Sequence, residues 1–350
     1  MTRRVFLTMP ALAAAQPAAG PQIGFDSYSV RAYQWKALEL VDYAARIGAR
    51  TLQLSSLGDF ESLEPAYLER VKQLAARKGV WLDAGIGCIC PLAGGWRAAD
   101  VDPATYLAKG LRVAKALGAS AMRCYLGNIN DRRKTPVSQL TEVALLGLRG
   151  VRTLAQDLGV KIAIENHGDL TARETRQLIE DAGKDYVGAC LDIGNPLWVL
   201  EDPLLTVEVL APYIVSTHLR DSALYAHPRG AAFQWLALGD GTMPVREIFA
   251  KVRQVAPRSP LHLEIITGRP PQVLAYHEDE LWKSFGSLPA ADFARFAALV
   301  KRGRPYEGGM IIADIPGGPA APAEYQAALK LQQRLDLERS LVFAKQLLVL

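Results

Sequence analysis

The chain has 350 residues, half of them hydrophobic and 22% charged, so it can bury a large core. Its 40 basic and 36 acidic residues leave a formal net charge of +4 without a long basic run, which argues against a nucleic-acid partner. Beyond residue 20 the sequence has no apolar stretch of about 18 residues, so we expect no membrane span.

The first twenty residues have the features of an export signal. Thr2-Arg3-Arg4-Val5-Phe6-Leu7 resembles the twin-arginine motif, and a short apolar segment from Val5 to Ala15 overlaps it. Small residues near Ala15 or Ala19 would provide a signal-peptidase site. We therefore predict a signal peptide over residues 1–20 and a periplasmic or exported protein. An ordinary basic, apolar N-terminus is the alternative, and it would leave the protein in the cytoplasm.

From residue 22 to residue 302, predicted strands alternate with predicted helices. The strands cover residues 23–30, 51–54, 80–89, 121–126, 161–165, 187–192, 214–219 and 261–266. The helices cover residues 37–47, 65–78, 103–117, 138–158, 171–182, 204–210, 245–255 and 290–301. Eight strands, each followed by a helix, predict an α/β fold of the (β/α)8 TIM-barrel type. A doubly wound open sheet is the runner-up, but Gly24-Phe25-Asp26-Ser27 does not supply the glycine-rich phosphate-binding turn that it would need.

Two long loops and a C-terminal extension complete the chain. The loops, residues 222–243 and 267–288, follow predicted strands and carry aromatic residues, so we expect a lid or a pocket wall there. Plain surface insertions are the alternative. Residues 303–350 are predicted to form a linker rich in glycine, proline and alanine and then one amphipathic C-terminal helix from residue 324. This helix would cover either the barrel or a second subunit of a homo-oligomer.

Four potential metal ligands lie at the ends of consecutive predicted strands. Glu165, Asp192 and His218 lie at the ends of the fifth, sixth and seventh strands, and Glu264 lies near the end of the eighth. Equivalent ends of parallel strands converge at one mouth of a barrel, so these side chains should reach a single ion. Each alone would more often be a cap, an ion-pair member or a hydrogen-bonded histidine. Together they form an oxygen-rich shell that suits one divalent cation (Mn²⁺, Mg²⁺ or Co²⁺) better than a closed structural zinc site.

The same strand ends carry motifs that resemble a known family. The motifs are Ile164-Glu165-Asn166-His167, Leu191-Asp192-Ile193-Gly194-Asn195, His218-Leu219-Arg220-Asp221 and Glu264. They are similar to those of the xylose isomerase-like TIM-barrel superfamily, in the sugar isomerase and epimerase branch that includes tagatose 3-epimerase and inosose dehydratase. The resemblance covers about residues 22–302. It implies that Glu165, Asp192, His218 and Glu264 bind one divalent cation and that Glu165 and Glu264 are the catalytic pair.

Four further residues are candidates for substrate binding: His167, Asn195, Arg220 and Trp235. In the family that the chain resembles, the position of His167 often faces the substrate, and a supporting role behind the ligands is the alternative. Asn195 could orient Asp192. Arg220 would bind a hydroxyl or carboxylate of the substrate unless it only pairs with Asp221. Trp235 is a candidate stacking platform for a sugar ring unless it belongs to the core or the rim.

These residues support several functional hypotheses. A metal that binds a carbonyl oxygen and the neighbouring hydroxyl acidifies the carbon-bound proton, which Glu165 and Glu264 would remove and return on opposite faces. The leading hypothesis is a metal-dependent isomerase or epimerase that acts on a free sugar or keto-sugar through an enediolate. The alternative is a lyase or dehydratase that acts on a keto-inositol or 3-keto-glycoside. A non-catalytic sugar-binding protein and an AP endonuclease rank lower, since the endonuclease would need three zinc ions and the chain has only five histidines.

Overall fold

The structure is a computed structural model that describes residues 22–98 and 101–349. The predicted signal peptide, residues 1–20, lies outside the described residues. Among the helices that are described, none is long and apolar enough to cross a membrane.

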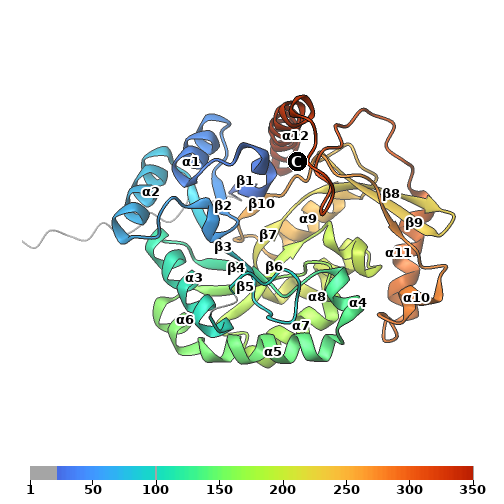
Figure 1. Ribbon diagram of the computed structural model, residues 1–350, viewed down its shortest axis with the longest axis horizontal. Coiled ribbons are helices and arrows are strands. Elements are labelled where there is room, and N and C mark those ends of the chain that lie inside the picture. Colours follow the sequence, from blue (N-terminus) through green and yellow to red (C-terminus); the bar gives the residue numbers. More distant parts are fainter. Residues whose placement is uncertain (1–21, 99–100, 350) are drawn as a thin grey trace, which may run out of the picture.

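Eight parallel strands form the centre of the molecule (Figure 1). They are β1 (Ile23–Asp26), β2 (Thr51–Leu54), β3 (Trp81–Cys88), β4 (Ala121–Tyr125), β5 (Lys161–Glu165), β6 (Val187–Asp192), β7 (Ile214–His218) and β10 (Leu261–Leu263). They pair in the order β10-β1-β2-β3-β4-β5-β6-β7. The sheet is closed just beyond β7, where the Leu219 N–H donates to the His262 carbonyl at 2.8 Å and the Glu264 N–H donates to the Leu219 carbonyl at 3.1 Å. The predicted (β/α)8 barrel is confirmed.

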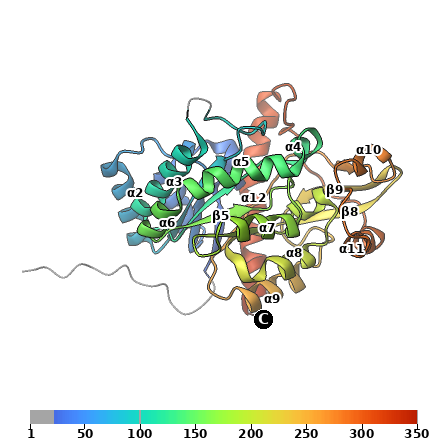
Figure 2. The same cartoon turned by 90° about the horizontal axis from the view of Figure 1, so that it is seen from below.

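Helices surround the strands on the outside (Figures 1 and 2). The longer ones are α1 (Ala37–Arg46), α2 (Pro65–Lys78), α3 (Pro103–Leu117), α5 (Val137–Gly150), α6 (Arg152–Leu158), α7 (Ala172–Ala182), α8 (Pro203–Leu210), α9 (Val245–Val255) and α11 (Ala290–Arg302). Two short helices, α4 (Ile129–Lys134) and α10 (Asp279–Trp282), lie in connections. Thr171 and Glu174 form a capping box at the start of α7. The single helix predicted over residues 138–158 is two helices, because Val151 leaves helical geometry between α5 and α6.

Strand β1 ends at Asp26, four residues earlier than predicted, and this early end affects the mouth of the barrel. The Asp26 carboxylate accepts a hydrogen bond from the Tyr28 N–H at 2.8 Å and thereby starts the 3-10 helix η1 (Ser27–Tyr33). The chain therefore turns at Asp26 and does not continue extended to Val30. This turn places Tyr28 and Arg31 in the wall of a cavity at the mouth.

The two segments predicted as long loops fold into an antiparallel sheet. β8 (Asp221–His227) and β9 (Gly230–Leu236) form a hairpin, and β11 (Gln272–Leu274) pairs with β9. Gly230 has a φ of 140° and lies close to the backbone of β11, where a Cβ would be 2.4 Å from the Leu274 carbonyl oxygen. Both features require glycine at this position. The loop prediction was wrong because β8 and β9 are rich in alanine, which has a weak preference for strands. The sheet nevertheless supplies part of the expected cavity wall, through Trp235 and Gln272.

The C-terminal helix α12 (Ala323–Val349) packs on the barrel beside β1 and β10 (Figure 1). Leu337, Leu341 and Ala344 are buried in this contact. The Gln333 side chain accepts a hydrogen bond from the Ala32 N–H at 3.0 Å, which ties the helix to η1. The helix therefore covers its own barrel. A homo-oligomer formed through its exposed face stays a prediction.

The packing of α12 can be tested by truncating one leucine. Leu337→Ala should lower the free energy of unfolding by about 2–5 kcal/mol, because Leu337 is fully buried and its truncation leaves a cavity. Leu335→Ala is the matched control on the same helix; Leu335 is 48% exposed, so the change should be within about 0.5 kcal/mol. Chemical denaturation followed by circular dichroism measures both values. Equal effects of the two substitutions would contradict the packing of α12 on the barrel.

Candidate metal centre and its cavity

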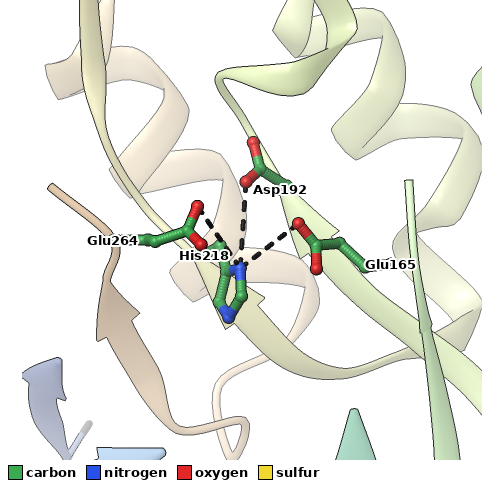
Figure 3. A group of neighbouring side chains, drawn as sticks. All are labelled: Glu165, Asp192, His218 and Glu264. Atoms are coloured by element: carbon green, nitrogen blue, oxygen red, sulfur yellow. Dashed lines mark ion pairs between the residues drawn. The ribbon is translucent and has the colours of Figure 1, made fainter. Parts of the chain in front are cut away.

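Four side chains meet at the mouth of the barrel (Figure 3). Glu165, Asp192 and His218 are the last residues of β5, β6 and β7, and Glu264 directly follows β10. All four are buried, and one donor atom from each lies within 4.8 Å of the others. The structure thus brings together the four predicted ligands, and they can hold one metal ion.

The imidazole of His218 has one ring nitrogen directed at the three carboxylates. Its Nε2–H donates to Gln53 Oε1 at 2.6 Å, which leaves Nδ1 to face the centre. Nδ1 has no hydrogen-bond partner among the described residues and lies 3.4, 3.8 and 3.7 Å from oxygens of Glu165, Asp192 and Glu264. Burial acts to lower the pKa of His218, but Cys190, Glu165 and Glu264 raise it well above its ordinary value. The position at Nδ1 therefore favours positive charge, which suits a divalent cation.

Hydrogen bonds to asparagines and backbone amides orient the carboxylates. Asp192 Oδ1 accepts from the N–H groups of Gly194 at 2.6 Å and Asn195 at 2.7 Å. The Asn195 side chain donates to Glu165 Oε1 at 3.1 Å. The Asn166 side chain accepts from the Asp192 N–H at 2.9 Å and donates to the Asp192 carbonyl at 2.8 Å. Asn195 therefore orients two of the ligands, and Asn166 links the ends of β5 and β6.

Two buried arginines offset the negative charge of the ligands. Arg123 pairs with Glu165, and Arg220 pairs with Asp192 and, at 2.9 Å, with Glu264. Burial acts to raise the pKa of Glu165, but Arg123 and His218 hold it well below its ordinary value. Three carboxylates and two guanidinium groups carry a net charge of −1, so a divalent cation would make the centre positive overall.

Arg220 does not pair with Asp221, the alternative considered for it from the sequence. The Asp221 carboxylate instead accepts hydrogen bonds from the N–H groups of Ser222 at 2.7 Å, Gly239 at 3.0 Å and Gly241 at 3.1 Å. Asp221 thereby fixes the segment that follows the β8–β9 hairpin. Arg220 is left to contact the metal ligands and the cavity.

Two buried residues that support the candidate ligands, Gln53 on β2 and Arg123 on β4, were not predicted from the sequence. Both are buried although they lie in strands of mostly apolar residues, Thr51–Leu54 and Ala121–Tyr125. The Gln53 side-chain amide also donates to Ser216 Oγ at 3.0 Å, which fixes its oxygen toward His218. A lone polar residue in a buried strand was the signal that could have identified them.

A cavity of about 1080 Å³ adjoins the metal centre. It is lined by Glu264 and by all four residues predicted to bind substrate, His167, Asn195, Arg220 and Trp235. The Nδ1 of His167 lies 2.7 Å from the Gly127 carbonyl, and the ring stacks on Tyr125 with centroids 4.1 Å apart. Trp235 is 5% exposed and packs edge-on against Trp198, so it is a wall of the cavity more than an open platform.

The role of Gln53 can be tested through metal affinity. Gln53→Leu should weaken Mn²⁺ binding by about 10- to 100-fold, because His218 loses the acceptor that fixes its tautomer and ring orientation. Isothermal titration calorimetry measures the affinity, and ¹⁵N NMR of the imidazole reports the tautomer. Gln73→Leu, on the exposed surface of α2, is the control. An unchanged affinity with an unchanged tautomer would contradict the assigned role.

Two known proteins resemble the chain in sequence. YihM, an uncharacterized protein of Escherichia coli, is 26% identical over 171 residues, which cover 48% of this chain and 47% of YihM. The chain thus spans about half the length of this relative. The 3-oxo-isoapionate decarboxylase of Pectobacterium atrosepticum is 24% identical over 243 residues, which cover 66% of this chain and 80% of the decarboxylase.

Solved structures share the fold at low sequence identity. A D-psicose 3-epimerase, solved in the presence of D-fructose, has a TM-score of 0.58 and 18% identity, and covers 93% of this chain and 99% of its own. A xylose isomerase-like TIM-barrel protein from Mycobacterium smegmatis, solved in complex with magnesium, has a TM-score of 0.55 and 14% identity, and covers 80% of this chain and 96% of its own.

The family model described as xylose isomerase-like TIM barrel matches residues 41–284, which is more than half of the chain. All four candidate ligands lie inside this match: Glu165, Asp192 and His218 at the ends of successive barrel strands, and Glu264 directly after β10. The chain therefore belongs to the xylose isomerase-like TIM-barrel family.

Proposed function

We propose that the protein is a divalent-metal-dependent carbohydrate isomerase or epimerase that acts on a free sugar or keto-sugar through an enediolate. The observation that carries this proposal is the placement of two glutamates around one candidate metal position. In Figure 3, Glu165 and Glu264 approach His218 Nδ1 from different sides. Two carboxylates in this arrangement suit the removal of a proton from one face of a substrate and its return to the other.

Glu165, Asp192, His218 and Glu264 would hold the cation. A divalent ion held there would polarise a carbonyl oxygen and the neighbouring hydroxyl and so acidify the proton between them. The oxygen-rich shell favours Mn²⁺, Mg²⁺ or Co²⁺. The magnesium in the Mycobacterium smegmatis structure supports an ion of this class.

The chain's own residues would bind the substrate and move the proton. Glu264 lines the cavity, so its carboxylate can take a proton from a substrate carbon directly. Glu165, which faces His218 Nδ1 from another side, would act on the opposite face of the substrate. Arg220 and Asn195, also in the cavity wall, would hold substrate oxygens. The Nε2 of His167 remains for a substrate hydroxyl, since its Nδ1 faces the Gly127 carbonyl. Return of the proton to the same carbon gives an epimer, and return to the adjacent carbon gives an aldose–ketose pair.

A lyase that acts on a keto-inositol or 3-keto-glycoside is the second candidate. The same enediolate expels a β-substituent when one is present, so the centre suits both outcomes. The sequence similarity to a decarboxylase, which breaks a carbon–carbon bond, favours this candidate more than a binding protein. An endonuclease with three zinc ions is not supported, because the described residues contain one such ligand group.

Deuterium exchange tests the proposed chemistry. The Mn²⁺-loaded protein is incubated in D₂O with ketohexoses, inososes and 3-keto-glucosides and followed by NMR. We expect deuterium at a carbon beside the carbonyl together with a new diastereomer or aldose. Glu264→Gln should slow exchange by about 10²- to 10⁴-fold, whereas Glu280→Gln on the exposed helix α10 should not change it.

The products separate the two candidates. Loss of a hydroxyl or an aglycone would assign the protein to the lyases. Stoichiometric metal binding without exchange on any of these substrates would contradict the proposed chemistry.

A further inference from the structure

The cavity is larger than a single sugar ring needs. Its volume of about 1080 Å³ lies just above the range of about 300–1000 Å³ that is usual for pockets of drug-sized ligands. Glu264, Arg220 and Asn195 lie at the end beside the metal centre. Other residues of the cavity wall are not used by the proposed chemistry, among them Tyr28, Arg31, Arg269 and Ile315. We call the part of the cavity lined by these four residues the outer compartment.

Two arginines of the outer compartment share one carboxylate. Asp314, in the connection between α11 and α12, accepts on Oδ2 from Arg31 Nε at 3.0 Å, Arg31 Nη2 at 2.5 Å and Arg269 Nε at 3.1 Å. Burial acts to raise the pKa of Asp314, but Arg31 and Arg269 hold it below its ordinary value. Two cations facing one anion leave a net positive charge beside the cavity.

The two arginines differ in how many of their donors are already used. Arg31 also donates to the carbonyls of Tyr28 at 3.1 Å and Thr267 at 2.8 Å, so it mainly clamps the chain. Arg269 gives one N–H to Asp314 and one to the Tyr28 hydroxyl at 2.6 Å. A guanidinium group has five N–H donors, and the described residues take up no more of them at Arg269. Arg269 therefore has donors left for a ligand in the cavity that it lines.

Trp235 connects the outer compartment to the metal end. The guanidinium carbons of Arg220 and Arg269 lie 5.4 and 5.5 Å from its ring centroid, so they are at most about 11 Å apart. The Trp235 Nε1–H is buried and has no partner among the described residues. One ligand of two sugar units could therefore contact Arg220, the ring of Trp235 and Arg269 at the same time. The rings of Tyr28 and Trp235 hold the Arg269 guanidinium in position before a ligand binds.

We infer that Arg269 binds a carboxylate of the substrate, and that the substrate is an acidic, two-part carbohydrate. One sugar ring lies at the metal end and a unit that carries the carboxylate lies in the outer compartment. This inference rests on the proposed function for the metal end. A guanidinium fork matches a planar carboxylate, and a charge-assisted hydrogen bond in a partly buried site distinguishes that group from a neutral hydroxymethyl group.

A pair of unreactive disaccharides tests the inference. Cellobiose and cellobiouronic acid differ in a hydroxymethyl group against a carboxylate, and isothermal titration calorimetry with the Mn²⁺-loaded full chain measures both affinities. The acid should bind about tenfold more tightly or better, since a hydrogen bond to a charged group is stronger than one to a neutral group. Arg269→Met should bring the two affinities within about twofold. Arg97→Met, which removes an exposed cation from the same cavity wall, should leave the preference intact.

Any of the following results overturns the inference. Equal affinity of the two disaccharides for the wild-type protein, or no binding of either, contradicts an acidic two-part substrate without any variant having to fold. Tighter binding of cellobiose phosphate than of the uronic acid contradicts the inference that the outer compartment selects a carboxylate. If Arg269→Met still prefers the uronic acid to the same degree, Arg269 is not the group that binds the carboxylate. Deuterium exchange on keto-sugars tests the metal end separately, so exchange without an acid preference overturns only this inference.

Discussion

The mutual repulsion of three buried carboxylates is the constraint around which the mouth of the barrel is built. Two like charges about 4 Å apart repel by about 4 kcal/mol even at an effective dielectric constant of about 20. Arg123 and Arg220 offset this repulsion, and His218 presents an unpartnered Nδ1 at the point where the three carboxylates meet. A divalent cation at that point would offset it further. The buried arginines and the metal site are therefore parts of one charge balance.

The strand register of the closed barrel determines which charged side chains meet at its mouth. Asp192 pairs in register with His218, whereas Glu165 is level with Cys190, two residues deeper than Asp192. This stagger of two residues reflects the tilt of the strands to the barrel axis, which brings Glu165 and Asp192 to the same mouth. The bridge between Leu219 and Leu263 fixes the last neighbour and places Glu264 beside Arg220. Strand register and strand tilt together thus bring the four candidate ligands to one point.

The sequence was sufficient to predict the barrel and the meeting of the four candidate ligands, but not the residues that support them. Glu165, Asp192 and His218 end apolar strands, and the topology of a parallel barrel brings such ends together. Gln53 and Arg123 contact the ligands from strands on other sides of the barrel, and no local pattern in the sequence shows that contact. The β8–β9 hairpin was missed for a different reason. Its alanine-containing strands are buried, with β8 against α11 and β9 paired with β11, and a propensity for strands does not measure that burial.

The connection between α11 and α12 shows how a segment without regular structure takes part in a site. Its composition predicts a linker, yet Asp314 is held by Arg31 and Arg269 while Ile315 and Pro316 line the cavity. The N–H groups of Ala313 and Asp314 both donate to the Gly268 carbonyl, at 3.1 and 3.0 Å. A carboxylate held this way in a chain that is anchored by α12 sets the charge of the outer compartment independently of the metal centre. Changes in this connection could therefore alter which ligands bind without disturbing the four metal ligands.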